Sequence, residues 1–333
     1  MQQVFRADDV LLARSVALKV PKNQSAQKRF KRSAVVSAKV NHANVAKTLD
    51  YVEEDDRTYL IEELIEGRDL SLVRADHLPF FDPHLTARAL HHLAKGLRAA
   101  HHAKVVHRDL KPSNVMVVGG NCLADFKITD FGIAKMAEVV IAEAAVDEKS
   151  LNASLTAMGA LPYMAPEAIE SLKDAKLPAD IWSLGAIAYE LLTGDKPFGS
   201  GLKAAVIICA GNPPQVPTMI GSKHQFRKLA QELMDIIQLC LRHDASTRPS
   251  ADQLVSLCEG LCYSNFLPKT GVVRRYRYNG GTCGFIECDD GSDVFFHQDS
   301  HYGIGNLKLG QRVCFGTHAG GGSDRAFPIL RCS

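Results

Sequence analysis

The chain has 333 residues, 46% of them hydrophobic and 23% charged, which is typical of a folded protein and excludes global disorder. Its formal net charge of +2 gives the whole chain little electrostatic attraction for nucleic acid or for acidic membranes. Nine scattered cysteines without a CxxC pair, and apolar runs too short to span a bilayer, predict a cytoplasmic protein with no membrane contact and no disulfide framework.

The N-terminal region begins with a predicted hairpin. Alternation of apolar and polar residues predicts strands over residues 4–7 and 14–20, joined by a polar turn that contains Asp8 and Asp9. Helical spacing follows over residues 26–40. We therefore expect a small β-rich unit at the start of the chain.

Residues 86–103 have the spacing of an amphipathic helix. Its apolar stripe consists of Ala89, Leu93, Leu97 and Ala100. The same helix carries two histidine pairs, His91–His92 and His101–His102. Adjacent helical side chains point apart, and no carboxylate or thiol completes a metal site, so we predict solvated histidines.

The loop at residues 105–114, with the sequence VVHRDLKPSN, and the later Asp-Phe-Gly turn that begins at Asp130 carry the candidate chemistry. The carboxylate of Asp109 can accept a hydroxyl proton, and the ammonium of Lys111 can stabilise a moving phosphate. Asn114 and Asp130 can hold Mg²⁺ through amide and carboxylate oxygens. These residue types together predict phosphoryl transfer.

The sequence HRDLKPSN, followed by TDFG and then by Met164-Ala165-Pro166-Glu167, resembles the eukaryotic-type (Hanks-type) protein kinase family. Lys111 is typical of the serine/threonine branch. The resemblance implies an α+β bilobal fold over residues 1–258, with a small β lobe and a large helical lobe. It also implies ATP and Mg²⁺ as cofactors, and proteins with serine or threonine hydroxyls as substrates.

The resemblance also assigns nucleotide contacts. Lys19, in the sequence VALK, would hold the α- and β-phosphates of ATP. Val4 and Ala17 would pack on the adenine, and backbone groups of Glu63 and Ile65 would meet its edge. The implied catalytic set is Lys19, Asp109, Lys111, Asn114 and Asp130.

The match fails at the N-terminus. Relatives have a glycine-rich loop before the strand that contains Val4, because glycine lets backbone N–H groups close over phosphates. Here the chain starts Met1-Gln2-Gln3, with Gln2 at the position of the last glycine. The first strand and most of that loop are therefore missing. Either the given start lies downstream of the true one, which we favour, or the nucleotide site lacks a roof.

The carboxylate that normally pairs with the strand lysine is also missing. Ser33 stands where relatives have a glutamate, and no acidic residue occurs between Lys19 and Asp50. Residues 59–67 resemble the fifth strand and hinge, which puts Glu62 at a position that is usually apolar. Because a buried unpaired carboxylate is costly, we predict that Glu62 pairs with Lys19 and contributes to the nucleotide site. The alternative is a slip of one residue that leaves Glu62 on the solvent face.

The segment that follows Asp130 suggests regulation. It contains the hydroxyls of Ser150, Ser154 and Thr156. A phosphate on one of them can be bound near Arg108 and order the segment, although incidental hydroxyls are an equally open interpretation. Ala160 lacks the hydroxyl that would brace Asp109 and Lys111, which predicts reduced turnover.

Two motifs further on match the scaffold of the large lobe. They are the sequence DIWSLG, which begins at Asp180, and Arg248-Pro249. In relatives, the residue at Glu167 pairs with the one at Arg248. We therefore expect an ion pair between Glu167 and Arg248.

A second unit follows a predicted linker at residues 259–269. Residues 270–333 have alternating strands with glycine-rich turns and resemble a cold-shock domain, a five-stranded barrel of the oligonucleotide-binding (OB) type. Such domains stack single-stranded RNA or DNA on aromatic side chains, which implies binding roles for Phe285, Phe295 and His297. The unit has seven Lys/Arg against six Asp/Glu, so a docking or regulatory role stays open.

Three functions are therefore open. We favour an ATP-dependent serine/threonine protein kinase, because the groups closest to the transferred phosphate are all present. The alternatives are a pseudokinase scaffold and a nucleic-acid-binding regulator in which the barrel has the main role.

Overall fold

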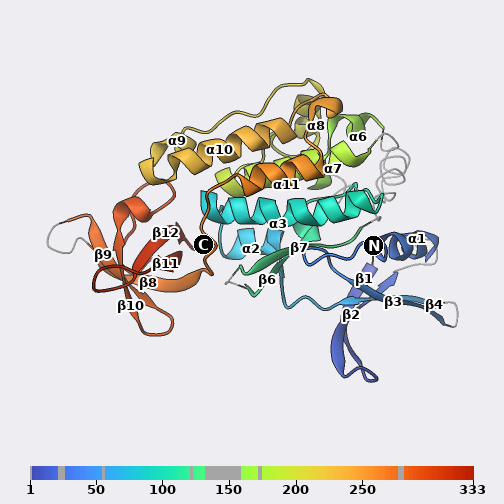
Figure 1. The fold of residues 1–333 in the computed structure, drawn as a ribbon, viewed down its shortest axis with the longest axis horizontal. Helices are drawn as coiled ribbons and strands as arrows, with labels where there is room; N and C mark the ends of the chain where they lie inside the picture. Colours follow the sequence, from blue (N-terminus) through green and yellow to red (C-terminus); the bar gives the residue numbers. More distant parts are fainter. Residues whose placement is uncertain are drawn as a thin grey trace.

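The computed structural model describes residues 2–21, 27–54, 57–120, 123–131, 159–171, 175–276 and 281–333, with only the backbone at 27–29 and 32–33. Gly132, Ser150, Ser154 and Thr156 lie outside the described residues, and so does the side chain of Ser33. A small sheet lies at one end of the molecule and a barrel at the other, with the layer of helices above both (Figure 1).

The small lobe is a four-stranded antiparallel sheet with one helix packed on it. The strands, in the spatial order β1-β2-β4-β3, are β1 (Gln2–Asp9), β2 (Arg14–Pro21), β3 (Thr48–Glu54) and β4 (Arg57–Glu63). Helix α1 (Gln27–Ser37) packs Phe30 and Ala34 against Leu60 and Tyr51 of the sheet. Apolar contacts therefore hold the helix on the sheet.

The turn between β1 and β2 lies at residues 10–13, so the prediction of a turn at Asp8 and Asp9 was wrong. Both residues still pair with β2. Asp9 Oδ1 accepts a hydrogen bond from the backbone N–H of Leu12 at 3.1 Å. The carboxylate closes the turn from the end of the strand, because a short acidic side chain can bond to backbone N–H groups a few residues on.

The large lobe consists of helices around a small antiparallel sheet. Its helices are α2 (Leu70–Asp76), α3 (Pro83–His102), α6 (Pro166–Glu170), α7 (Leu177–Thr193), α8 (Gly201–Cys209), α9 (Met219–Ser222), α10 (His224–Cys240) and α11 (Ala251–Glu259). The sheet has the order β5 (Gly67–Asp69), β6 (Val115–Val118), β7 (Asp125–Ile128). Helix α7 is almost fully buried, and its Trp182 ring stacks on Phe198 with centroids 5.3 Å apart. Among the described helices, none combines the length and the apolar character needed to cross a membrane.

Helix α3 runs under the site loop and begins three residues before the predicted start. Asp82 is the reason, because its Oδ1 accepts hydrogen bonds from the backbone N–H groups of His84 at 2.8 Å and Leu85 at 3.2 Å. Pro83 occupies the first position, which suits a residue without an N–H. The predicted apolar stripe is confirmed as buried: Ala89, Leu93, Leu97 and Ala100.

The prediction that the histidines of this helix are solvated was wrong for His91 and His101. Each is only 7% exposed. His91 Nδ1 lies 2.7 Å from the hydroxyl oxygen of Tyr263, and His101 Nε2 lies 3.0 Å from Asp180 Oδ2. Both partners come from distant parts of the sequence, so the spacing of residues along one helix could not reveal them.

The C-terminal region forms a closed barrel of five strands, which confirms the predicted architecture. In chain order the strands are β8 (Lys269–Tyr276), β9 (Cys283–Cys288), β10 (Asp293–His297), β11 (Arg312–His318) and β12 (Arg325–Arg331). They close in the order β10-β12-β11-β8-β9, and only the β10–β12 pair is parallel. Closure leaves no free sheet edge, which protects a small barrel from pairing with other chains.

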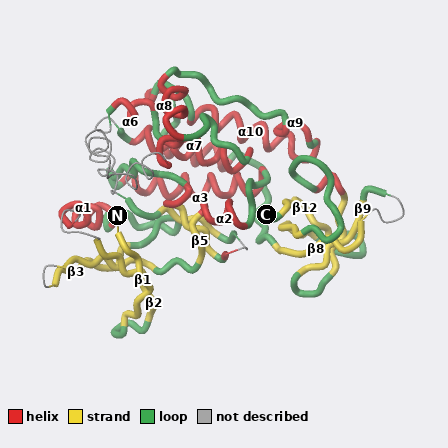
Figure 2. The backbone as a smooth tube through the Cα atoms, turned by 180° about the vertical axis from the view of Figure 1, so that it is seen from behind, coloured by secondary structure: helices red, strands yellow, loops and turns green. Residues whose placement is uncertain are grey.

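One face of the barrel packs against the large lobe. Tyr302, Cys314 and Leu330 belong to the same buried apolar cluster as the helices. The ring of Phe327 stacks on Phe226 of α10 with centroids 5.1 Å apart. Both views place the barrel at the α9–α10 end of the helical layer (Figures 1 and 2). The barrel and the large lobe therefore share one core.

This shared core makes a prediction for Leu330. Replacing Leu330, which is 3% exposed, with alanine is expected to lower the free energy of unfolding by about 2–5 kcal/mol through lost burial and the cavity left behind. Leu309→Ala is the matched control, since Leu309 is 63% exposed in the same barrel and its truncation should change stability by about 0.5 kcal/mol or less. Urea denaturation of the full chain measures both. Equal, small effects would show that the barrel does not pack on the lobe.

Candidate active site

The loop that carries Asp109 is held from below by Asp180 of helix α7. Asp180 is fully buried, and its two carboxylate oxygens accept hydrogen bonds from the backbone N–H groups of His107 and Arg108, both at 2.8 Å. His101 provides a further contact at 3.0 Å. Several donors around one carboxylate offset the cost of its burial. Asp180 was predicted only as scaffold, and its direct contact with the loop was missed.

His107 connects this loop to the second acidic turn. Its Nδ1 accepts a hydrogen bond from the backbone N–H of Asp109 at 3.2 Å, and its Nε2 lies 2.8 Å from the carbonyl oxygen of Thr129. A carbonyl can only accept, so the proton is on Nε2. The His107 ring also packs on Phe131, with centroids 4.7 Å apart. The two halves of the predicted site are therefore in direct contact.

Asp109, Lys111 and Asn114 contact one another as the sequence predicts for a shared site. Lys111 Nζ lies 2.8 Å and 3.0 Å from the two carboxylate oxygens of Asp109. Asn114 Nδ2 donates to the backbone carbonyl of Asp109 at 2.7 Å and to its Oδ2 at 3.2 Å. Because the amide nitrogen faces these acceptors, the amide oxygen is the atom that can face a cation. The side chain of Asp109 is 24% exposed and thus open to a substrate.

The hairpin of β6 and β7 brings Asn114 next to Asp130. Val115 at the start of β6 pairs with Ile128 at the end of β7, so the residues just outside the hairpin lie at the same end. The backbone N–H of Thr129 donates to the carbonyl of Asn114 at 2.9 Å. Asp130 follows with a φ of 61°, a left-handed conformation that costs a residue with a side chain roughly 1–2 kcal/mol. Such strain is typical of functional positions.

The ammonium of Lys19 lies between two carboxylates. Its Nζ is 2.5 Å from Glu62 Oε2 and 2.6 Å from Asp130 Oδ1. The predicted Lys19–Glu62 pair is therefore confirmed, and the solvent-facing alternative is excluded because Glu62 is 4% exposed. Gln2 Nε2 also donates to Asp130 Oδ1, at 2.9 Å. The sequence placed Gln2 at the position of the last glycine of the glycine-rich loop, and this contact was not predicted.

Burial and charge act in opposite directions on these groups. Burial lowers the pKa of Lys19, but the negative charges of Asp130 and Glu62 outweigh it and leave that pKa raised. Burial raises the pKa of Asp130, but Lys19, together with the Gln2 hydrogen bond, leaves it below its ordinary value. Burial raises the pKa of Glu62 above its ordinary value. Lys19 lowers this pKa without offsetting the burial, and the negative charge of Asp130 raises it further. The outcome is a cationic Lys19 next to an anionic Asp130.

The register of the small sheet places the predicted adenine contacts on one face. Val4 pairs with Lys19, and Ala17 pairs with Glu62. Residues directly opposite on neighbouring strands share a face of the sheet, and so do residues two apart on one strand. Val4, Ala17, Lys19 and Glu62 therefore all face the same side. Val4 is 56% exposed there, so its side chain is accessible to a ligand.

Glu63 and Ile65 lie where β4 leads into β5. The backbone N–H of Glu63 donates to the carbonyl of Lys47 at 2.8 Å, so this N–H is used within the fold. The side chain of Glu63 pairs with Lys127 of β7, away from Lys19. Ile65 is half-buried in the connection. Contacts of these backbones with an adenine stay a prediction.

The residues at this site fit a magnesium ion held jointly with a nucleotide. Within the described ranges, no group of three His, Cys, Asp or Glu side chains could hold a metal ion alone. Asp130 and Asn114 offer two oxygen donors of the kind that Mg²⁺ prefers. Magnesium commonly takes one or two protein ligands and completes its shell with phosphates and water.

Glu167 and Arg248 form the predicted ion pair. The two guanidinium nitrogens lie 2.7 Å and 2.9 Å from the two carboxylate oxygens. Ala160 lies just before the short helical turn Leu161–Tyr163 and has no hydroxyl to offer Asp109. The described hydrogen-bond partners of Asp109 all belong to its own loop. The reduced turnover expected from the missing hydroxyl of Ala160 stays a prediction.

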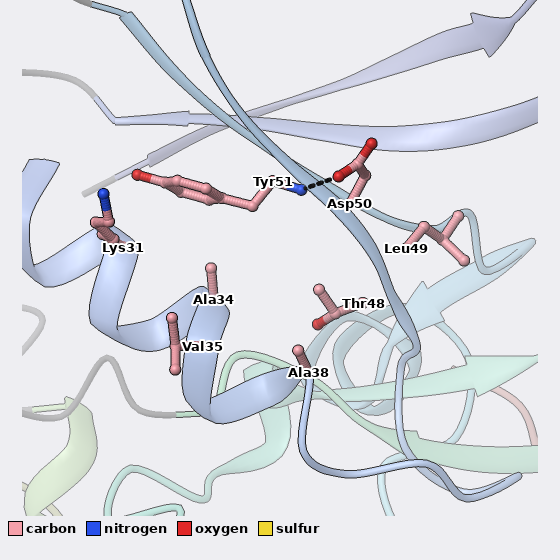
Figure 3. A pocket seen from close by; sticks show the side chains of 8 residues that line it. All are labelled: Lys31, Ala34, Val35, Ala38, Thr48, Leu49, Asp50 and Tyr51. Atoms are coloured by element: carbon pink, nitrogen blue, oxygen red, sulfur yellow. Dashed lines mark hydrogen bonds between the residues drawn. The ribbon is translucent and has the colours of Figure 1, made fainter.

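A pocket of about 290 Å³ lies on the small lobe between α1 and β3 (Figure 3). Its lining residues are Lys31, Ala34, Val35, Ala38, Thr48, Leu49, Asp50 and Tyr51. None of them belongs to the predicted catalytic or nucleotide set. The pocket is therefore separate from the site described above.

On the barrel, Phe285 and Phe295 lie side by side on β9 and β10. Their rings make an edge contact with centroids 5.7 Å apart, and both side chains are half-buried. The guanidinium carbon of Arg325 lies 6.0 Å from the Phe295 ring centroid. His297 is close by in sequence, with Nε2 2.6 Å from the Thr282 hydroxyl. Among the described residues, the apolar contacts of the barrel with the large lobe come from Tyr302 and from β11 and β12.

The model of the protein kinase domain matches residues 2–257. The chain belongs to this family. The match includes every residue of the small lobe and of the loops that carry Asp109 and Asp130.

Curated relatives of this kinase domain come from several bacteria. It is 31% identical over 262 residues to the serine/threonine-protein kinase PknA of Corynebacterium glutamicum, an alignment that covers 74% of this chain and 50% of the relative. It is 35% identical over 231 residues to PknA of Mycobacterium tuberculosis, covering 65% and 50%. It is 30% identical over 203 residues to PrkC of Bacillus subtilis, covering 60% and 29%. The chain thus spans half or less of the length of these relatives.

Proposed function

We propose that the chain transfers the γ-phosphate of ATP to serine or threonine hydroxyls of protein substrates. The observation that carries the proposal is a continuous run of contacts from Lys19 to Asp130, from there through Thr129 to Asn114, and on to Asp109. It joins a cation, two oxygen donors and a proton acceptor in one site. The names of the bacterial relatives support a serine or threonine acceptor.

The residues divide the reaction between them. Asp109 accepts a hydrogen bond from the substrate hydroxyl and takes its proton as the new oxygen–phosphorus bond forms and the bond from the γ-phosphorus to the bridging oxygen of ADP breaks. Lys111, 2.8 Å from Asp109, stabilises charge on the transferred group. Lys19 binds the α- and β-phosphates. Asn114 and Asp130 would hold the magnesium ion, which would neutralise the phosphate charges when bound.

A labelling assay on the full chain tests this function. With γ-labelled ATP, Mg²⁺ and a dephosphorylated, serine- and threonine-rich acceptor protein, label is expected on serine or threonine. Chelation of Mg²⁺ is expected to abolish transfer, because Asn114 is neutral and Asp130 is anionic, so without the cation neither of them neutralises the triphosphate. ATP binding without any transfer would overturn the proposal and favour a pseudokinase scaffold.

A second function is supported by the neighbouring aromatic rings of Phe285 and Phe295 on the barrel. The proposed division of the chain is a kinase domain at 1–258, a linker at 259–269 and a cold-shock-like barrel at 270–333. In that barrel, single-stranded RNA or DNA would bind to Phe285, Phe295 and His297. The neighbouring half-buried rings of Phe285 and Phe295, with Arg325 over one of them, carry this proposal.

The expected effect of Phe295→Ala follows from base stacking. Loss of one stacked base is worth about 1–3 kcal/mol, so affinity for an oligonucleotide should fall roughly 5- to 150-fold. Phe5→Ala is the matched control, since Phe5 is 49% exposed on the small lobe and its loss should leave RNA affinity unchanged. A fluorescence titration at several salt concentrations measures both. Equal affinities for the wild type and Phe295→Ala would reject the barrel as an RNA platform.

A further inference from the structure

We propose that Glu62 is the positioning residue for Lys19, so that the phosphate-binding lysine is held by the sheet of the small lobe and not by helix α1. The inference rests on the proposed function, because it gives Lys19 its role.

The Lys19–Glu62 pair is short and enclosed. Lys19 Nζ lies 2.5 Å from Glu62 Oε2, and the two side chains are 7% and 6% exposed. Strand β2 pairs Lys19 with Leu60 of β4, two residues before Glu62, so lysine and carboxylate project from the same face of neighbouring strands. Backbone hydrogen bonds between β2 and β4 therefore set the distance between the two charged groups.

The other contact of the ammonium does not make Glu62 redundant. Asp130 also touches Lys19, at 2.6 Å, but Asp130 belongs to the large lobe and is the proposed cation ligand. When a nucleotide and a cation engage Asp130, Glu62 is the carboxylate that stays with Lys19. It then keeps the amine aimed at the phosphates.

Helix α1 cannot provide this carboxylate. No acidic residue occurs between Lys19 and Asp50, and the helix lies within that interval. Within the described residues, α1 contacts the rest of the site through apolar packing and one hydrogen bond. Phe30 and Ala34 pack in an apolar cluster, and Ser37 Oγ donates to the carbonyl of Phe131 at 3.3 Å. A displacement of α1 would therefore leave the ion pair of Lys19 intact.

Two measurements on the full chain test the role of Glu62. In Glu62→Gln, affinity for Mg²⁺–ATP is expected to fall about 10- to 100-fold, the value of one hydrogen bond to a charged group. Loss of the carboxylate also removes the contact that holds the ammonium of Lys19 in its enclosed position, so an amine-reactive reagent should modify Lys19 several-fold faster, as measured by peptide mass spectrometry. Glu62→Asp, which retains the charge, should recover part of both properties.

The chain offers a matched control pair. Lys31 and Glu53 form a lysine–glutamate contact of 2.9 Å on the same lobe, with both side chains about half exposed. Glu53→Gln should leave ATP affinity and Lys19 modification at wild-type values. If Glu62→Gln also retains both values, or if Glu62→Asp behaves like Glu62→Gln, the positioning role is overturned.

A third variant tests the independence from α1. Ser37→Ala removes the hydrogen bond to Phe131 and should leave the rate of Lys19 modification unchanged. A faster rate would show that the helix also holds the lysine, against the proposal. These readouts need no phosphate transfer. A wild type that binds ATP without transferring phosphate would overturn the kinase function, while the modification rates would still decide whether Glu62 positions Lys19.

Discussion

Asp109→Asn is expected to lower the rate of phosphate transfer by about 10²- to 10⁴-fold, the usual contribution of a general base. Asparagine has nearly the same shape but cannot take up the substrate proton. The nucleotide affinity should stay close to wild type, because Asp109 contacts Lys111 and Asn114 and not Lys19. Single-turnover transfer from γ-labelled ATP, combined with calorimetric ATP binding, measures the two quantities separately.

Asp235→Asn is the control for this substitution. Asp235 is an exposed residue of α10 that bonds to Gln231 on the same helix at 2.9 Å. Its variant should transfer phosphate at the wild-type rate. A normal rate in Asp109→Asn would rule out Asp109 as the base, and a loss of both binding and transfer would point to collapse of the loop.

Arg248→Ala is expected to lower the free energy of unfolding by about 3–5 kcal/mol, because it removes a fully buried guanidinium and leaves the partly buried carboxylate of Glu167 without its partner. The Arg248 side chain is 0% exposed and contacts Glu167 with both terminal nitrogens. It also donates to three backbone carbonyls and lies over the Trp182 ring, 4.9 Å from the centroid. Chemical denaturation of the full chain gives the magnitude.

Lys228→Ala is the control for Arg248→Ala, because it removes the cation of an ion pair that lies at the surface. Lys228 is 88% exposed and 3.9 Å from Glu232, so its loss should cost about 0.5 kcal/mol or less. Comparable effects in the two variants would mean that the Glu167–Arg248 pair does not hold the large lobe together.

The parts of the site that depend on short stretches of sequence could be predicted. Asp109, Lys111 and Asn114 lie close together in one short loop, so their mutual contacts follow from local geometry. The Lys19–Glu62 pair was also predictable, because no acid was available in the helix and burial of an unpaired carboxylate is costly. Alternation and glycine-rich turns predicted the strands of the C-terminal unit, and the resemblance to a cold-shock domain implied that they close into a barrel.

Contacts between distant segments could not be predicted. His101 was predicted to be an exposed helical residue, but it is buried and its Nε2 contacts Asp180 of α7. Asp9 resembled a turn residue because its side chain acts on the turn from the end of β1. The packing of Leu330 and Phe327 against the large lobe depends on the complementary surfaces of two units, which periodicity within either unit does not report.

The most direct test of the kinase function is a single turnover by the full-length chain. Wild-type protein is first mixed with γ-labelled ATP. Mg²⁺ and acceptor protein are then added together, the reaction is quenched with acid, and the product is analysed for labelled amino acids. The proposed chemistry predicts label on serine or threonine from the wild type and almost none from Asp109→Asn. Intact ATP recovered from the wild type, or equal labelling by both proteins, would contradict it.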